Sequence, residues 1–158
     1  MDERSVTENG GRAARQESSA RQRTVMELVR TADLVRRYFT ELYAPHGLAP
    51  QQYNVLRILR GARPQPLATM EIAERMLEKT PGITRLLDRL EEKGLVERER
   101  HPEDRRVVLC SITDRGLELL DTLETPVREA TEGVLREFDD EEVARLSELL
   151  ARVRAGVA

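Results

Sequence analysis

The sequence predicts a mainly α-helical fold with one small β-hairpin, an α+β arrangement. Three observations predict it. Apolar residues recur at three- and four-residue steps over residues 21–43 and again over 113–153. Between these regions, two short amphipathic segments over residues 69–93 end at a glycine. Two β-rich runs, residues 95–100 and 107–112, then flank a charged loop that contains a proline.

Length and composition limit the class of protein. A chain of 158 residues fits one domain, or one small domain with a helical extension. Aromatic residues make up only 3%, so the core must be built mainly from aliphatic side chains. No apolar run approaches the roughly 20 residues that cross a bilayer, and the N-terminus has no apolar signal segment. These features predict a cytoplasmic protein without a membrane partner.

The charge is distributed unevenly along the chain. The formal net charge is −3, made up of +4 over residues 1–68, −1 over 69–110 and −6 over 111–158. An acidic C-terminal third would repel nucleic acid. Any DNA-binding surface therefore has to lie away from it, on a local cationic face of the first two thirds.

The N-terminal half is predicted to contain two helices after a tail. Residues 1–20 are polar, with paired glycines and serines, and predict a flexible arm. A helix is expected over residues 21–43, followed by a break at residues 44–47. Pro50 suits the first turn of the second helix, which Gly61 and the following prolines should end.

Two threonines mark the next helix starts. Thr69 is predicted to cap a short helix that runs to about residue 77. Thr80 is a stronger N-cap, because Pro81 follows at a position where its missing N–H costs nothing. The helix that it caps should run to Lys93 and stop at Gly94.

Two further helices are expected at the C-terminus. Thr113 can cap a helix to about residue 138, in which Pro126 should produce a kink or an interruption. Asp139 and Glu142 have the spacing of a capping box for the last helix.

The helix over residues 81–93 has the distribution expected of a helix that enters a DNA major groove. On a helical wheel, Ile83, Leu86, Leu87 and Leu90 form a face to be buried. Thr84, Arg85 and Arg89 lie on or beside the opposite face, where they can reach base edges and phosphates. The acids on this helix, Asp88, Glu91 and Glu92, would repel DNA, and most lie in its C-terminal half.

The charged loop strengthens the DNA interpretation. Arg105 and Arg106 lie at the tip of the predicted hairpin, where an arginine can enter a narrow minor groove. Asp104 stands two residues before Arg106, and we expect it to pair with that guanidinium and orient it. Two helices followed by such a hairpin make a winged helix-turn-helix.

In these motifs the chain resembles the MarR family of winged helix-turn-helix regulators. The resemblance is carried by residues 83–116, which contain Thr84-Arg85, the Arg89–Leu95 exit, the Asp104-x-Arg106 wing and the Ile112-Thr113-x-x-Gly116 helix entry. In element order it extends over about residues 21–153.

This resemblance implies a homodimeric regulator, most simply a repressor that a small aromatic or phenolic effector releases from a palindromic operator. It implies dimerisation helices at 21–47 and 113–158 around a DNA-binding domain at 48–112. Thr80, Thr84, Arg85 and Arg89 would meet the major groove, Arg106 the minor groove and Arg105 phosphate. The matching effector cleft would include Tyr38, Tyr43, His46 and Tyr53, although such residues more often serve core and interface packing than ligand contact.

Other chemistry finds little support. A single cysteine, Cys110, in an apolar strand is expected to be a buried structural residue rather than a redox sensor. With only His46 and His101, far apart in the sequence, we expect no metal, no cofactor and no enzymatic activity. The acids on the recognition helix leave one alternative open, a winged helix used for protein–protein contact without a specific DNA site.

Overall fold

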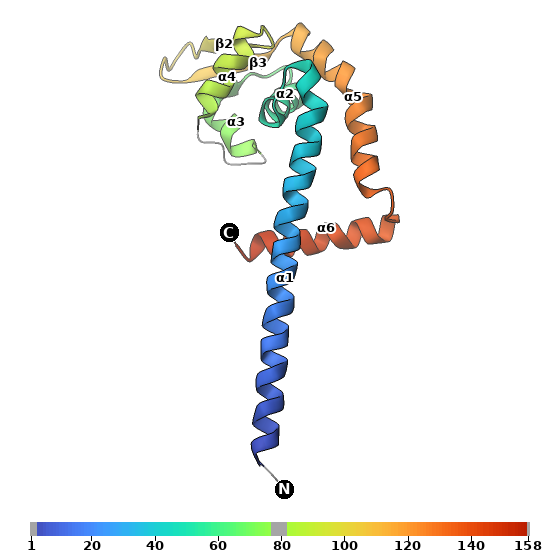
Figure 1. Ribbon diagram of the computed structural model, residues 1–158. Coiled ribbons are helices and arrows are strands. Elements are labelled where there is room, and N and C mark those ends of the chain that lie inside the picture. Colours follow the sequence, from blue (N-terminus) through green and yellow to red (C-terminus); the bar gives the residue numbers. More distant parts are fainter. Residues whose placement is uncertain (1–2, 77–81, 158) are drawn as a thin grey trace. The chain divides into compact units, whose positions relative to one another are not determined.

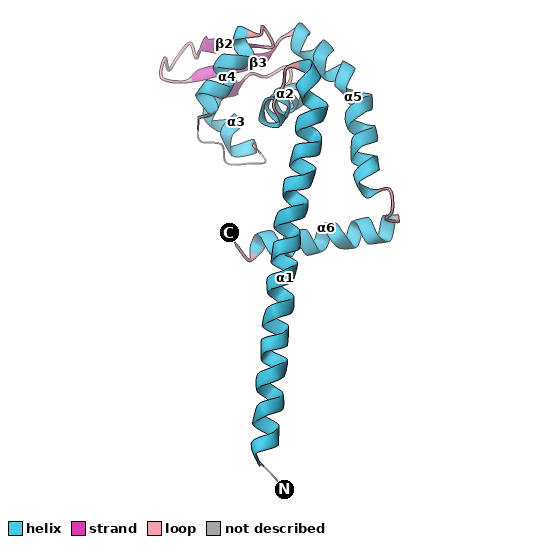
Figure 2. Cartoon of the chain, in the orientation of Figure 1, coloured by secondary structure: helices cyan, strands magenta, loops and turns pink. Residues whose placement is uncertain are grey.

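The computed structural model describes residues 3–76 and 82–157, with side chains from residue 19 onward. Helices dominate, and three short strands form one small sheet (Figures 1 and 2). The predicted mainly α class with a small β-wing is therefore confirmed. In chain order the elements are α1 (Glu3–Tyr43), the 3-10 turn η1 (Ala44–His46), α2 (Pro50–Ala62), β1 (Leu67–Ala68), α3 (Thr69–Arg75), α4 (Ile83–Glu92), β2 (Val96–Arg100), β3 (Val108–Ile112), α5 (Asp114–Leu135) and α6 (Asp140–Ala155).

The chain forms two compact units, Met1–Thr40 and Glu41–Ala158. The first contains most of α1. The second contains everything from the end of α1 onward, so the C-terminal helices belong to the same unit as the helix-turn-helix and the hairpin. Among the residues that the structure describes, no helix is both long and apolar enough to span a membrane.

The sheet has the strand order β1-β3-β2, and all its pairs are antiparallel. β2 and β3 form the predicted hairpin, with Val96 opposite Ile112 and Arg98 opposite Cys110. β1, which pairs Leu67 with Cys110, was not predicted from the sequence. A strand of two residues has no alternation to recognise, and only its pairing with β3 defines it.

The core of the second unit is formed by α2, α3, α4, the first half of α5 and the sheet. Its largest fully buried side chains are aliphatic, apart from one cysteine: Val55, Leu56, Leu59, Ile72, Leu87, Leu90, Val96, Cys110, Leu120 and Leu123. Gln52 is the buried polar side chain among the described residues, and its Oε1 accepts a hydrogen bond of 3.0 Å from the backbone N–H of Ala49. That bond satisfies a first-turn donor of α2.

The N-terminal prediction was wrong in its secondary structure. Residues 3–20, expected to be an irregular arm, continue α1 toward the N-terminus. Alanine, arginine, glutamine and glutamate, which are frequent between residues 12 and 23, are strong helix formers, and a helix already formed by later residues extends through them without a new nucleation cost. Glycine is unfavourable in a helix by about 1 kcal/mol per residue, and the pair at positions 10 and 11 does not end α1.

Thr69 does not cap α3. Ala68 occupies the N-cap position, and its N–H donates to the Glu71 carboxylate at 2.9 Å. The Thr69 hydroxyl instead donates to the carbonyl of Val108 at 3.3 Å, across to β3. Because β1 ends at Ala68, the sheet sets the start of α3. The Thr69 hydroxyl is then available for its hydrogen bond to β3, which connects α3 to the hairpin.

The junction between the hairpin and α5 is tightly built. Thr113 caps α5 as predicted, accepting from the Gly116 N–H at 3.1 Å, and its own hydroxyl donates to the Gly94 carbonyl at 2.8 Å. A Cβ on Gly116 would lie 2.5 Å from the Leu95 carbonyl oxygen and 2.7 Å from the Ile112 side chain. Only a glycine allows α5 to start this close to the end of the sheet.

The remaining C-terminal predictions had mixed outcomes. The Asp139–Glu142 capping box is confirmed, with reciprocal backbone bonds of 2.8 and 3.1 Å. Pro126, by contrast, does not interrupt α5, which runs through it to Leu135. Proline removes one hydrogen bond, to the carbonyl of Thr122, and Thr122 is exposed, so water can serve that carbonyl.

Candidate nucleic-acid interface

The recognition helix α4 begins two residues later than predicted. Gly82 precedes Ile83 at the N-cap position with φ of 101°, a left-handed conformation that favours glycine. Thr80 and Pro81, expected to start this helix, lie outside the described residues. The helix therefore starts from a sharp backbone turn rather than from a proline in its first turn.

The faces of α4 divide largely as the helical wheel predicts. Leu87 and Leu90 are completely buried against α2, α3 and β2, whereas Ile83 and Leu86 are only half-buried. Thr84, Arg85 and Arg89 are all exposed. The helix thus presents one hydroxyl and two guanidinium groups to solvent, while its buried leucines hold it against the rest of the unit.

The end of α4 is confirmed at Gly94, which adopts a φ of 68°. The Gly94 N–H donates to Glu91 at 2.8 Å, and the Leu95 N–H donates to Leu90 at 2.9 Å. This is a Schellman motif, in which Leu95 and Leu90 also supply the apolar contact. The chain turns directly into β2, so the recognition helix and the hairpin are joined without a loose linker.

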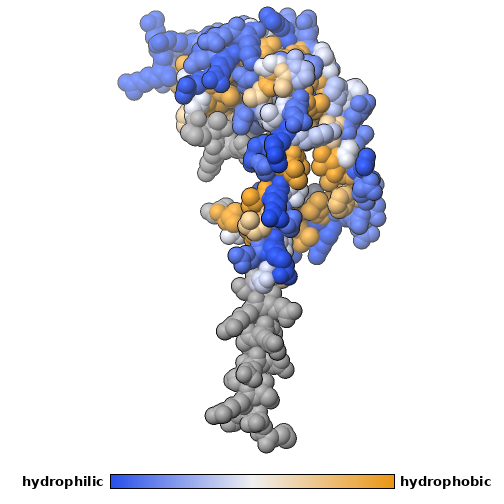
Figure 3. All heavy atoms as spheres, in the orientation of Figure 1, coloured by the Kyte–Doolittle hydropathy of each residue, from blue (hydrophilic) through white to orange (hydrophobic). Residues whose placement is uncertain are grey.

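The hairpin tip is held by side chains that accept from the backbone. The His101 Nδ1 accepts from the N–H groups of Glu103 and Asp104 at 3.2 and 3.3 Å. The Asp104 carboxylate accepts from the backbone N–H of Arg106 at 3.0 Å. Arg105 and Arg106 stand exposed on this ordered turn. Figure 3 shows hydrophilic surface gathered over this end of the molecule.

The role predicted for Asp104 is therefore corrected. Its carboxylate accepts from the Arg106 backbone N–H, and no ion pair joins it to the Arg106 guanidinium within the described part of the chain. A carboxylate two residues before an N–H closes a local turn more readily than it reaches the end of a long arginine side chain. The guanidinium stays available for another partner.

Sequence reasoning missed Arg98 in β2. Its side chain, 21% exposed, donates from Nη2 to Asp88 at 2.8 Å and from Nε to Glu91 at 2.9 Å, with a second contact from Nη2 to Glu91. These contacts raise the pKa of Arg98, the hydrogen bond to Glu91 contributing most. Two of the three acids thought to repel DNA are therefore already paired. The alternation of β2 predicts which face of the sheet carries the Arg98 side chain. It does not predict that α4 packs beside that face and supplies the two acids.

The proposed effector residues do not form an open cleft. Tyr43 and Tyr53 are buried and stack with ring centroids 4.5 Å apart, while His46 is half-buried in η1. Burial and the neighbouring Tyr53 raise the pKa of Tyr43 to about 12, although Arg57 acts in the opposite direction. Tyr38 belongs to the first unit and is 47% exposed.

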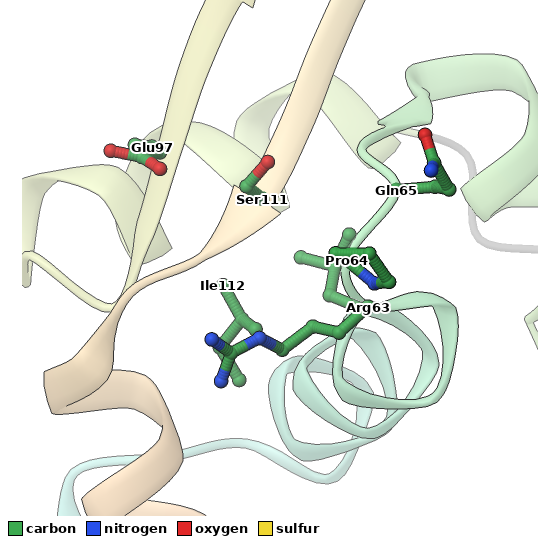
Figure 4. Close-up of a pocket in the computed structure, with 7 residues that line it drawn as sticks. Arg63, Pro64, Gln65, Glu97, Ser111 and Ile112 are labelled. Carbon is green, nitrogen blue, oxygen red and sulfur yellow. The ribbon is translucent and has the colours of Figure 1, made fainter.

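A shallow pocket of about 180 Å³ lies elsewhere in the second unit. It is bounded by the end of α2, the loop that follows and the sheet, and Figure 4 shows the Arg63 side chain extended toward Ile112. None of the four expected effector residues lines this pocket. Its lining residues are Leu59, Arg63, Pro64, Gln65, Glu97, Ser111 and Ile112.

Cys110 is buried in β3, with its sulfur 3.9 Å from the Thr69 hydroxyl. Burial is the main cause that raises the pKa of the thiol, which keeps it in its less reactive form. In the described residues, no group of three or more His, Cys, Asp or Glu side chains is placed to hold a metal ion. The predicted absence of metal and cofactor remains a prediction.

Comparison with known proteins assigns the family. A sequence profile described as the MarR family matches residues 48–108, which span α2 through the start of β3. The HTH-type transcriptional regulator MhqR of Bacillus subtilis is 34% identical over 108 residues, 68% of this chain and 73% of that protein. The chain belongs to the MarR family.

Solved MarR structures agree. The MarR transcription factor from Planctomyces limnophilus is 43% identical, with a TM-score of 0.67 over 82% of this chain and 94% of that one. A mutant MarR from Escherichia coli complexed with operator DNA is 28% identical, with a TM-score of 0.72 over 80% and 89% of the two chains. This MarR-family chain is thus a DNA-binding transcriptional regulator, and the resemblance seen in residues 83–116 is confirmed.

Proposed function

We propose that this MarR-family regulator binds duplex DNA with α4 in the major groove and the hairpin tip in the neighbouring minor groove. The observation that carries the assignment is the exposure of Thr84, Arg85 and Arg89 on one packed helix that leads directly into the hairpin. Side chains of these types reach base edges and phosphates in the major groove. We assign Thr80, three residues before Ile83 in the sequence, to the same groove.

The wing contributes Arg105 and Arg106. Both are exposed on a turn that His101 and Asp104 hold in place, so little conformational entropy is lost in the backbone when the tip binds. We assign Arg106 to the minor groove, whose narrow form attracts arginine, and Arg105 to phosphate. Asp104 orients this pair through the turn.

We also propose a homodimer. α6 has no buried residue in the single chain, although Leu149 and Val153 lie one turn apart and are 41% and 46% exposed. Val25 and Val29 in the first unit are similarly uncovered, at 58% and 57%. Such rows of apolar surface favour a partner helix. A two-fold dimer would read a palindromic operator with half-sites about one helical turn apart.

The domain boundaries follow from this assignment. Residues 48–112 would form the DNA-binding domain, and residues 21–47 and 113–158 would supply the dimer contacts. Figure 3 supports this division, since hydrophobic surface appears along α5 and α6 while the hairpin end is hydrophilic. The acidic C-terminal third, with its net charge of −6, would then lie away from the DNA.

The simplest regulatory mode is repression relieved by a small aromatic or phenolic effector. One relative, 29% identical over 78% of this chain and 82% of its own length, is named the homoprotocatechuate degradative operon repressor of Escherichia coli. Tyr38 and His46 have exposed surface for such a ligand, whereas Tyr43 and Tyr53 would have to separate to admit one. We assign no catalytic role, because DNA binding accounts for the exposed side chains of the interface.

A gel-shift with the duplex upstream of the chain's own coding region tests the function. The wild type should give a shift that resists nonspecific competitor and weakens with salt. Arg106→Ala should weaken it and reduce the salt slope by about one, while Arg128→Ala, an exposed arginine on α5, should not. A protein that folds and dimerises but gives no competitor-resistant shift would favour a protein–protein module instead.

The effector proposal has its own test. A small molecule that binds only the folded protein must raise its melting temperature, so a thermal-shift screen of phenols and aromatic acids should find stabilising compounds. A true effector should also release the DNA in the gel-shift at the same concentration. Stabilisation without release would separate binding from regulation.

A further inference from the structure

The ion pairs of Arg98 connect two elements that would otherwise contact different grooves. Arg98 lies in the middle of β2, whereas Asp88 and Glu91 lie one turn apart on α4. The guanidinium uses both Nε and Nη2, so its plane is set by two acceptors rather than one. Such a geometry restricts direction as well as distance.

The position of Arg98 on the sheet shows why this connection matters. Val96 and Ile112 share its face and are buried, so the base of the hairpin is anchored by apolar packing. Two residues farther toward the tip, Arg100 on the same face is exposed. Arg98 therefore lies where apolar anchoring ends and the free part of the hairpin begins.

The acids gain from the same contacts. Side chains of Asp88 and Glu91 are 43% and 41% exposed, so without a partner their charges would face solvent on the recognition helix. Paired with Arg98, they are directed toward the hairpin. One arginine thus offsets the repulsion that these carboxylates would exert on phosphate.

We propose that Arg98 is a positioning residue that clamps the wing to the recognition helix and so sets the separation between Arg106 and the DNA-facing side of α4. This inference rests on the proposed DNA-binding function. Because the two acids are 43% and 41% exposed to solvent, their ion pairs contribute little to global stability, so the clamp should act mainly on the orientation of the hairpin. Its loss would increase the cost of ordering the wing on DNA.

A charge swap tests the clamp. Arg98→Glu places three acids together and should weaken binding to the upstream duplex by about tenfold or more, because the pair attraction becomes repulsion of the same order. Adding Glu91→Arg restores an opposite-charge pair between the same two positions. The double variant should recover to within about threefold of the wild type.

The matched control pairs Arg98→Glu with Glu99→Arg. It has the same net charge as the swap, but Glu99 is exposed on the opposite face of β2, away from α4. It should bind as weakly as Arg98→Glu alone. If the swap were as weak as this control, Arg98 would contact DNA itself and the clamp would be refuted.

Hydrogen exchange without DNA gives a readout that separates the clamp from the function. Amides of β2 and β3 near the tip should exchange faster in Arg98→Glu and in Asp88→Asn/Glu91→Gln, and return to the wild-type rate in the swap. Asp88→Asn/Glu91→Gln keeps the arginine, and it provides the test if Arg98→Glu fails to fold. If hydrogen exchange in Asp88→Asn/Glu91→Gln equals that of the wild type, the clamp is overturned. If the wild type fails to shift DNA, only the proposed function is overturned.

Discussion

Gly116 is the residue where side-chain size is most tightly limited. The start of α5 packs so closely on the end of the sheet that an added Cβ would meet the Leu95 carbonyl at 2.5 Å, a backbone atom that cannot move aside cheaply. The same helix start carries the Thr113 cap, which bonds to both Gly94 and Gly116. One position therefore couples the end of α4, the hairpin and the C-terminal helices.

Gly116→Ala should lower the free energy of unfolding by about 1–3 kcal/mol, because overpacking forces backbone to shift. Urea denaturation monitored by circular dichroism measures it. Gly61→Ala is the matched control, since that helical glycine in α2 has nothing within 4 Å of the added Cβ. The control should stabilise the protein by about 0.5–1 kcal/mol. Equal effects at the two sites would contradict the packing argument.

The buried Tyr43 predicts a dependence on alkaline pH. Its pKa rises in the folded state from 10.0 to about 12, so the folded protein prefers the neutral phenol. The corresponding stability is complete below pH 10 and is lost as the pH rises from 10 toward 12. Unfolding midpoints in urea should therefore fall over this range. In Tyr43→Phe, which cannot ionise, this part of the decrease should be absent.

At the scale of elements, the recognition helix and hairpin form one unit because their connections are local and short. A Schellman motif ends α4, and only three residues separate the helix from β2. The hairpin tip is closed by acceptors within its own seven residues, His101 and Asp104. Such local chemistry was partly readable from sequence, as with Gly94. The target of Asp104 was not, because spacing alone does not distinguish a backbone N–H from a guanidinium.

Asp104 variants distinguish these two roles. Asp104→Asn keeps an oxygen acceptor for the Arg106 N–H and should bind the operator within about threefold of the wild type. Asp104→Ala removes the acceptor and should weaken binding by about tenfold, as the turn at the tip loosens. Fluorescence anisotropy with labelled duplex measures both. If the asparagine variant were as weak as the alanine variant, the carboxylate charge would be the essential feature.

At the scale of the whole molecule, the distribution of apolar surface favours assembly. α6 begins with a strong capping box and has apolar residues at helical spacing, yet none of them is buried in the single chain. A helix is stabilised mostly by packing of its apolar face, so this face requires a partner. A second copy of the chain meets that requirement and explains why the sequence retains the row.

Leu149→Glu/Val153→Glu should convert the dimer to a monomer, because two charges would have to be buried at the contact. Sedimentation velocity at micromolar concentration measures the change. Ala151→Glu places a charge on the opposite, exposed face of α6 and should leave the dimer intact. The monomer should also lose most of its operator affinity, since it binds one half-site only. A double variant that still sediments as a dimer would exclude α6 from the interface.

The sequence by itself determined the class of fold, the order of the main helices, the hairpin and most of the candidate DNA contacts. These features depend on periodicity, caps and turns, which act over a few residues. Tertiary structure decided β1, the use of Thr69, the close start of α5 at Gly116 and the partners of Arg98. Each depends on residues from distant segments meeting at van der Waals or hydrogen-bond distance. Asp88 and Glu91 show the difference best, since in sequence they oppose DNA binding and in the fold they hold the wing.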